Sequence, residues 1–443
     1  MEHQPLPRRS IRLLAISPRF APINGADTHR LRLLLRYAAQ SDWQVTVLAV
    51  DSADVVGSVD SWLADQVPGD VPVYRVRAWK TAGWGFNGLA QRSLWPLYRK
   101  GCELLAKDSF DLVFFSTTEF ALHILGPMWK RRFGIPFCMD YQDPWVNDYY
   151  RDHPEVVPPG GRFKFAIAEG ISRQLERVVV RSCSGFLAVS QAYLTEIARR
   201  YGASVQGKPM LVQPFPAEPG ELDALGGFTA KAEGAASSMV WRYIGRGGPD
   251  MVKAGTAFFE AWRCALADGT IREDSVRFEA YGTSYADAGK GEKTFEPLAE
   301  AAGMQQMVTE VPDRLGYSDV LRMLAGSDAL IVFGSDDPAY TASKIYPYLL
   351  AGKPLLAIFH EQSSVVSLIK QVGGGVCVTL KENMSIEELA STIRRAWFGN
   401  CSFEQSTALD LAAFEEFTAR AQAKEIGLWF ERILDCHRES AGQ

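Results

Sequence analysis

One segment in the last third of the chain constrains the fold most: two continuous apolar runs flank a short helical pattern. The runs at 329–334 and 355–359 have the length and the unbroken apolar character of buried parallel strands. Between them, apolar residues recur at helical spacing, with Thr341 or Ser343 as the predicted N-cap and Gly352 at the far end. Strand, helix and strand in this order predict a βαβ unit of a parallel sheet.

The start of this helix is predicted to attract a phosphate group. Amide groups at a helix N-terminus, placed at the carboxyl edge of a parallel sheet, favour anionic ligands. Lys344 lies in the first predicted turn and adds a mobile positive charge. The alternative for a single lysine is a solvated surface position, and the sequence leaves both open.

Length and composition indicate a globular protein of two domains. The chain has 443 residues, of which 47% are hydrophobic and 22% charged, and domains usually contain about 100 to 200 residues. A stretch rich in Pro, Gly, Ala and Glu separates two series of predicted strands and helices. We therefore predict an N-terminal domain at 1–215, a linker at 216–238, a second domain at 239–405 and a C-terminal helical segment at 406–443.

Several classes of protein are disfavoured by what the sequence contains. Its apolar runs fall short of the roughly 20 residues that span a bilayer, and the residues after Met1 do not read as a secretory signal. The seven cysteines show no paired metal-ligand spacing, which favours reduced thiols in the cytoplasm over a metal site. We expect a cytoplasmic protein without a metal or a cofactor, and no nucleic-acid partner.

Charge differs between the two halves of the chain. Residues 1–215 contain 26 Lys and Arg against 20 Asp and Glu, whereas the remainder contains 21 against 32. Within the basic half, residues 79–100 interleave aromatic and cationic side chains, which suits an anionic membrane surface. Ordinary scatter of charge, and packing of these aromatic residues into the core, are the alternatives.

Two stretches of the first half place polar residues after predicted strands. A loop rich in turn formers contains Gly25 and Asp27 and follows the first strand, but it lacks the glycine fingerprint of dinucleotide-binding folds. Asp140 and Asp143 come at the end of a later strand, at the sheet edge where catalytic groups gather. Asp143 is a candidate general base or acceptor-orienting group, and an Asx turn before Pro144 is the structural alternative.

The second half begins with a strand that runs directly into a glycine-rich turn. Gly245 and Gly247 would let the backbone approach a diphosphate, and Arg246 between them could bind it in bidentate fashion. Lys253, in the first turn of the following helix, could add positive charge. Together with Lys344, this turn indicates an anion site in the second domain.

These motifs together resemble the family 4-like glycosyltransferases of the GT-B fold, which use nucleotide-sugar donors. The resemblance spans nearly the whole chain and is carried by Gly25, 111–113, 134–136, 143–145, 187–190, 243–246, 327–330 and, above all, 343–354. The last of these is similar to the family pattern Lys-x-x-Glu-Tyr-Leu-x-x-Gly-Lys-Pro. The resemblance implies two Rossmann-like, doubly wound domains facing a cleft, with the donor on the second, the acceptor on the first, and a C-terminal helix returning to the first.

The chain departs from the family at two positions. Where the family commonly has two glutamates eight residues apart, one for the donor sugar and one for the ribose, this chain has Ala339 and Pro347. A proline inside the helix would remove an amide hydrogen bond and kink it. Asp336 or Asp337 could contact the sugar hydroxyls in place of the missing glutamates.

The function implied by the resemblance is metal-independent, hexosyltransferase-like transfer of a sugar from a nucleotide diphosphate sugar. Arg246, Lys253, Lys344 and the amide at Ser343 would stabilise the departing diphosphate. The acceptor, contacted by Gly25, Asp27, Asp140 and Asp143, would be a polysaccharide or a lipid-linked glycan at the cytoplasmic membrane face. Polysaccharide biosynthesis is the implied process.

Two other functions fit the same pattern. The substitutions at Ala339 and Pro347 favour an inactive GT-B scaffold that acts as a partner in polysaccharide assembly. A GT-B enzyme of another reaction type, such as a nucleotide-sugar epimerase, is the third hypothesis.

Overall fold

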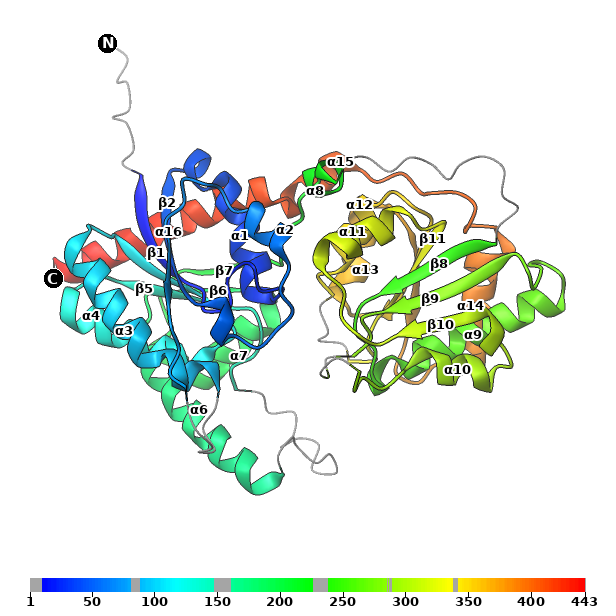
Figure 1. Cartoon of the computed structure of the whole chain (residues 1–443), viewed down its shortest axis with the longest axis horizontal. Coiled ribbons are helices and arrows are strands. Elements are labelled where there is room, and N and C mark those ends of the chain that lie inside the picture. Colours follow the sequence, from blue (N-terminus) through cyan, green and yellow to red (C-terminus); the bar gives the residue numbers. More distant parts are fainter. Residues whose placement is uncertain are drawn as a thin grey trace, which may run out of the picture. The chain divides into compact units, whose positions relative to one another are not determined.

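The computed structural model of the chain describes residues 10–80, 88–146, 161–225, 238–284, 286, 289–337 and 342–442. Two compact units are present, each with its own sheet (Figure 1). The first contains residues 1–216 and 419–443, and the second contains 217–418. Of the predicted linker, 217–225 therefore lie in the second unit and 226–237 lie outside the described residues. The predicted C-terminal segment divides between the units after Thr418.

The sheet of the first unit is parallel throughout its described strands. Its order is β3-β2-β1-β4-β5-β6-β7, so that the direction of winding reverses between β1 and β4. The strands are β1 Ile11–Ile16, β2 Trp43–Val50, β3 Val73–Val76, β4 Leu112–Ser116, β5 Phe137–Tyr141, β6 Gly185–Ala188 and β7 Met210–Val212. A crevice at such a reversal is the usual ligand position of open α/β sheets.

Helices cover both faces of this sheet. They are α1 Ala26–Ala38, α2 Ser61–Asp65, α3 Leu89–Lys107, α4 Leu125–Phe133, α6 Arg162–Ser182, α7 Gln191–Tyr201 and α16 Ala419–Ala441. Successive residues of a strand point to opposite faces, and β4 shows the result. Phe114 packs on Phe430 of α16 with 5.4 Å between ring centroids, whereas Phe115 stacks on Trp129 of α4 at 6.1 Å.

The second unit repeats this design with a smaller parallel sheet. Its order over the described strands is β10-β9-β8-β11-β12-β13, and β11 and β12 are the two strands predicted at 329–334 and 355–359. The strands are β8 Met239–Ile244, β9 Val276–Tyr281, β10 Val308–Val311, β11 Ala329–Phe333, β12 Leu355–His360 and β13 Val376–Leu380. The helices are α8 Gly220–Ala224, α9 Val252–Ala267, α10 Phe295–Ala301, α11 Tyr317–Ala325, α12 Ile345–Leu350, α13 Ser364–Val372, α14 Ile386–Ile393 and α15 Leu411–Phe414.

The side chains of β8 alternate between the two faces of the sheet. They connect the core of the second unit with the carboxyl edge of that sheet. Trp241 lies on one face against Trp262 of α9, with centroids 5.6 Å apart. Tyr243 lies on the same face, packed edge-on against Phe333 at 5.2 Å. On the other face, the backbone amide of Ile244 donates to the hydroxyl of Tyr348 in α12 at 2.6 Å. The last residues of β8 are thus held from both sides.

A buried ion pair ties the helix after β1 to the strand end of β5. The guanidinium of Arg30 donates to the carboxylate of Asp140 at 3.0 and 3.2 Å, and both side chains are fully buried. The remaining guanidinium hydrogens reach the carbonyl oxygens of Pro214 and Gln213 at 2.6 and 2.7 Å. Arg30 lies on α1 and donates both to β5 and to the residues after β7. It therefore joins these three segments.

We expect Arg30→Met to destabilise the first unit by about 3–5 kcal/mol, because it leaves the carboxylate of Asp140 buried without its charge partner. Arg438→Met, on α16 of the same unit, is the matched control, since Arg438 pairs with Asp435 and the two side chains are 73% and 63% exposed. Loss of such a pair costs about 1 kcal/mol or less. Denaturant titration of both variants measures the difference, and equal losses of stability would contradict a special role for the buried pair.

Candidate active site

The turn after β8 is built around the side chain of Lys344. Gly245 has φ 157°, and a Cβ added there would lie 2.8 Å from Nζ of Lys344 and 2.9 Å from its Cδ. Only glycine leaves room for the lysine at this point. The structure therefore brings together Gly245 and Lys344, two of the residues predicted for the donor site. The space that a side chain at position 245 would occupy is filled by Lys344.

A tyrosine that the sequence analysis did not select holds the amino group of Lys344. Nζ lies 4.3 Å from the ring centroid of Tyr243 and donates a hydrogen bond to its hydroxyl. The tyrosine hydroxyl in turn donates to the carbonyl oxygen of Arg246. Burial lowers the pKa of Lys344 well below its usual range, and the charge of Arg246 lowers it further, while Asp250 opposes the shift.

Arg246 lies beside this lysine and is paired within its own turn. Its guanidinium donates to both carboxylate oxygens of Asp250, at 2.9 and 2.7 Å. Desolvation raises the pKa of Asp250, but the hydrogen bonds from Arg246 and Ser335 outweigh it, and the net pKa is lowered. The turn and the start of α12 thus bring Arg246, Asp250 and Lys344 together.

The backbone of the glycine turn is already engaged. The amide of Gly245 donates to the carbonyl of Tyr281 at 2.9 Å, and the amide of Gly247 donates to the carbonyl of Thr283 at 2.7 Å. A Cβ at Gly247 would lie 2.3 Å from Oγ1 of Thr294. The room that the sequence predicted for a diphosphate at these two glycines is therefore filled by Lys344 and Thr294.

The other predicted donor-site residues are Lys253, Asp336 and Asp337, and they lie at different distances from the cluster around Lys344. Nζ of Lys253 donates to the carbonyls of Lys381 and Glu382 at 3.0 and 3.1 Å, so its charge is directed to the end of β13. Asp336 and Asp337 are exposed after β11. Burial raises the pKa of Asp336, and the nearby carboxylate of Asp250 raises it further. The amide of Asp336 donates to the carbonyl of Asp250 at 3.0 Å, which places this loop beside the turn.

The helix predicted to bind phosphate is shorter than expected. It begins at Ile345, after a turn at Ser343 and Lys344, and the side chain of the N-cap residue Lys344 makes no capping hydrogen bond within the described part of the chain. Thr341 and Ala339 lie outside the described residues. Pro347 is the third residue of α12, where an amide has no helical partner in any case. The predicted loss of a helical hydrogen bond at Pro347 is therefore wrong.

In the first unit the structure corrects one predicted acceptor contact. Asp140 is fully buried, and besides Arg30 it accepts hydrogen bonds from Gln142 at 3.0 Å and Ser116 at 3.4 Å. Its carboxylate is engaged by hydrogen bonds within the protein and is not accessible to a ligand. Asp143 is exposed at the same sheet edge, and desolvation by its surroundings raises the pKa of its carboxyl group.

Asp27 is buried at the start of α1, close to the β1–β4 reversal. Its Oδ1 accepts hydrogen bonds from the amide and hydroxyl of Thr118 at 3.1 and 3.3 Å, while its Oδ2 is buried without a hydrogen-bond partner. Burial raises the pKa of Asp27 to about 6, although hydrogen bonding to Thr117 and Thr118 opposes the shift. Gly25 precedes it at the uncapped helix start, where an added Cβ would meet no described atom within 4 Å.

At this edge, two further buried polar atoms have no hydrogen-bond partner among the residues that the structure describes, and the sequence analysis missed both. They are Oγ of Ser17, directly after β1, and Oε1 of Gln142, directly after β5. Buried polar groups are normally satisfied by protein or water. With Asp27 they indicate hydrogen-bonding capacity for a polar ligand. A position directly after a strand of a parallel sheet was the signal available for finding them.

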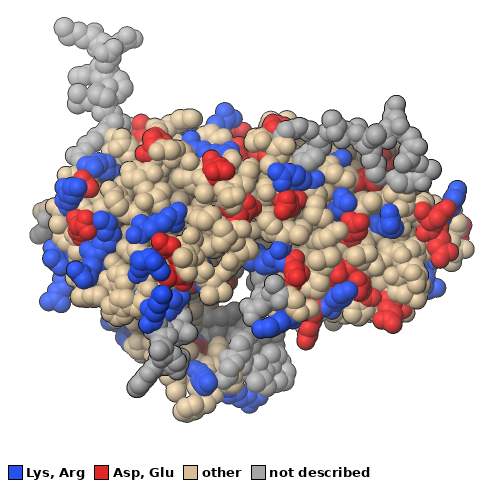
Figure 2. All heavy atoms as spheres, viewed as in Figure 1, with Lys and Arg blue, Asp and Glu red and all other residues tan. Residues whose placement is uncertain are grey.

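The predicted basic and aromatic stretch at 79–100 is only partly described, because 81–87 lie outside the described residues. Trp79 and Trp95 are about half exposed, at 54% and 47%, and Trp95 stacks on Tyr98 with centroids 5.2 Å apart. Figure 2 shows Lys and Arg side chains clustered over the α3–α4 part of the first unit.

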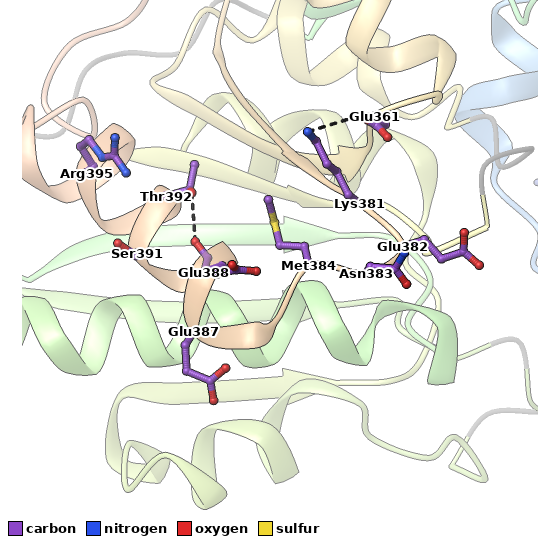
Figure 3. A pocket seen from close by; sticks show the side chains of 10 residues that line it. All are labelled: Glu361, Lys381, Glu382, Asn383, Met384, Glu387, Glu388, Ser391, Thr392 and Arg395. Atoms are coloured by element: carbon purple, nitrogen blue, oxygen red, sulfur yellow. Dashed lines mark hydrogen bonds and ion pairs between the residues drawn. The ribbon is translucent and has the colours of Figure 1, made fainter.

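A separate surface hollow of about 880 Å³ lies in the second unit, between the end of β13 and α14 (Figure 3). It is lined by Glu361, Lys381, Glu382, Asn383, Met384, Glu387, Glu388, Ser391, Thr392 and Arg395. None of the residues predicted for the donor site lines it. Its four carboxylates would repel a diphosphate, so the candidate site remains the turn after β8.

Comparison with known proteins addresses the fold and part of the family assignment. Residues 24–216 match the sequence model of the glycosyl transferase 4-like domain. This match confirms the predicted family 4-like resemblance for that part of the chain. No curated protein sequence matches the chain.

Solved structures of similar fold span both units. HepE of Anabaena, solved with UDP and glucose, is 16% identical with a TM-score of 0.55, and 98% of each chain is covered. Sucrose-phosphate synthase of Thermosynechococcus elongatus is 13% identical with a TM-score of 0.59, over 96% of this chain and 100% of that one. WaaG, a glycosyltransferase of lipopolysaccharide biosynthesis, is 15% identical with a TM-score of 0.52, over 96% and 99%. The predicted two-unit GT-B fold is confirmed.

We expect Gly245→Ala to destabilise the second unit by about 2 kcal/mol or more, because the new methyl group meets Lys344 and the backbone must keep a φ of 157°. Gly25→Ala is the control, since its φ of −151° suits any residue and its surroundings are open. Thermal unfolding of both variants tests this expectation. A fully stable Gly245→Ala protein would show that Lys344 does not need this space.

Stability should depend on pH through Asp27. The pKa of Asp27 is about 6 when folded and 3.8 when unfolded, so the folded chain binds this proton more tightly. Stability is therefore lost as pH rises from about 4 to 6, by about 3 kcal/mol in total. The melting temperature of Asp27→Asn, relative to wild type, should rise between pH 4.5 and 7.5. With the exposed Asp65→Asn as control, a difference for Asp27→Asn that stays constant with pH would refute this assignment.

Proposed function

We propose that the chain is a glycosyltransferase that takes its sugar from a nucleotide diphosphate donor. The observation that carries this proposal is the meeting of Lys344 and Arg246 at the carboxyl edge of the second sheet, with the half-buried lysine packed against Tyr243. A desolvated cation is unfavourable without an anion beside it. A diphosphate would supply that anion, and its charge grows as the sugar departs.

Support for the donor class comes from the similar structures. HepE was solved with UDP-glucose and with UDP, and both ligands carry a diphosphate. In this chain, Lys344 and Arg246 would neutralise that group without a metal ion, as proposed from the sequence. To bind a phosphate, the guanidinium of Arg246 would share its donors with Asp250 or exchange that partner for the ligand.

The first unit supplies the groups suited to an acceptor. Sugar hydroxyls both donate and accept hydrogen bonds. Ser17, Asp27 and Gln142 have oxygen atoms with remaining capacity, but these atoms are buried and would have to be uncovered for an acceptor to reach them. Asp143 is exposed with a raised pKa and stays the candidate for accepting a proton from the attacking hydroxyl. A polysaccharide or lipid-linked acceptor at the cytoplasmic membrane face completes the proposal.

The alternative is an inactive scaffold in polysaccharide assembly. Asp250 already neutralises part of the charge of Arg246, and Pro347 stands where the family has a glutamate. Incubation with nucleotide sugars separates the two functions. An enzyme should release nucleoside diphosphate by slow donor hydrolysis, and an inactive scaffold should release none even where it binds the donor. A changed sugar without acceptor would instead indicate an epimerase.

Binding of UDP, used as the probe, should take up protons through Lys344. A bound diphosphate raises the lowered pKa of this lysine, so a proton enters with the ligand and affinity falls as pH rises. Calorimetric titrations in buffers of different ionisation enthalpy measure this uptake. We expect Lys344→Met to abolish it and to weaken UDP binding about 10- to 100-fold.

The exposed Lys370→Met, on α13, serves as the control and should bind UDP like wild type. The melting temperature of Lys344→Met should not fall, because the variant removes a desolvated amino group. Wild-type binding of UDP by Lys344→Met would exclude Lys344 from the donor site.

A further inference from the structure

Helix α6 is held by one face only. Among its 21 residues, the buried ones are Glu176, Val179 and Val180, all in the C-terminal third, and none of residues 162–175 is buried. Glu176 fixes the rotation of the helix, since its carboxylate accepts hydrogen bonds from Tyr141 at 3.2 Å and from Arg200 at 3.0 Å. The helix extends beyond the sheet of the first unit (Figure 1).

The opposite face of α6 carries an apolar stripe. Phe163, Ile167, Ile171 and Val178 are exposed by 79%, 50%, 51% and 47%. Their spacings of four, four and seven residues place them on one side of a helix. Taking about 100° per residue, this stripe points away from the buried side chains of Val179 and Val180. A continuous apolar row facing water is unusual for the surface of a monomer and marks an interaction site.

The charges beside the stripe are positive. Lys164, Arg177 and Arg181 are exposed on α6. The two acidic residues of the helix are engaged elsewhere, Glu169 with Arg173 at 2.6 Å and Glu176 with Arg200. The outer surface of α6 therefore combines apolar side chains with unopposed cations from its own sequence.

The neighbouring helix extends this chemistry. Helix α4 contacts α6 and carries Met128, which is 39% exposed, together with the exposed Arg131 and Arg132. The exposed side of α6, with cations beside its apolar row, matches a bilayer interface with anionic headgroups. A peptide-binding groove would require a concave apolar site. Among the described residues no helix has the length and apolar character needed to cross a bilayer, so contact would be at the surface.

We propose that the stripe on α6 inserts into the interface of an anionic lipid bilayer. The basic residues beside it contact the headgroups, and Phe163, Ile167 and Ile171 enter the region between headgroups and acyl chains. The inference rests on the membrane-face location in the proposed function, but it does not require catalysis. It assigns to α6 the contact that the sequence analysis placed at 79–100.

The experiment is flotation of the full chain with vesicles of phosphatidylcholine alone, or with 30% phosphatidylglycerol. Wild type should bind the anionic vesicles, and the bound fraction should fall with added NaCl. The stripe variant Phe163→Ser/Ile167→Ser/Ile171→Ser should bind about tenfold less or weaker still at low salt. The charge variant Lys164→Gln/Arg177→Gln/Arg181→Gln should lose the preference for anionic vesicles.

The matched control replaces apolar residues of similar exposure away from α6. Val56 and Leu411 are 77% and 67% exposed, and Val56→Ser/Leu411→Ser should bind vesicles like wild type. Melting temperatures confirm folding, and UDP titration of every variant keeps donor binding separate from membrane binding. Wild-type flotation by the stripe variant, or failure of wild type to bind anionic vesicles, would overturn the proposal. Self-association that the stripe variant abolishes would assign the stripe to a second copy instead.

Discussion

The half-buried amino group of Lys344, held against Tyr243, is the constraint on which the donor half of the candidate site depends. An ammonium group removed from water needs compensating partners, and the chain supplies a tyrosine ring, its hydroxyl and the space left by Gly245. The hydroxyl of Tyr243 donates to the backbone carbonyl of Arg246, and the side chain of Arg246 is held by Asp250. The positions of Lys344 and Arg246 are therefore set before any ligand arrives, and a bound diphosphate would compete with Asp250 for the donors of Arg246.

The first unit contains a buried ion pair that is satisfied within the protein. Arg30 and Asp140 pair with each other, and Arg30 also donates to the backbone carbonyls after β7. What remains at the sheet edge are oxygen atoms with unused hydrogen-bonding capacity at Ser17, Asp27 and Gln142. The two edges thus differ in chemistry, one suited to an anion and the other to neutral hydroxyl groups. Transfer of a sugar from an anionic leaving group to a hydroxyl acceptor would use both.

Local patterns predicted the sheets well, because buried parallel strands appear in the sequence as continuous apolar runs such as those of β11 and β12. The role of Asp140 could not be predicted, since its partner Arg30 is 110 residues away and only the fold brings them together. Gly247 was assigned to a ligand because the sequence does not show that Thr294 occupies its space. Pro347 was misjudged through the helix boundary: a start at Ile345 makes the proline a first-turn residue.

One carboxylate connects the exposed stripe of α6 with the acceptor half of the site. Glu176 lies on the inner face of the helix and accepts a hydrogen bond from the hydroxyl of Tyr141, the last residue of β5. The next residue along the chain is Gln142, whose Oε1 is one of the unsatisfied atoms at the sheet edge. A helix anchored in a bilayer would therefore be attached directly to the strand end that offers hydrogen bonds to an acceptor. Since a lipid-linked acceptor is itself confined to the bilayer surface, such an attachment would keep that strand end close to the acceptor and raise its local concentration.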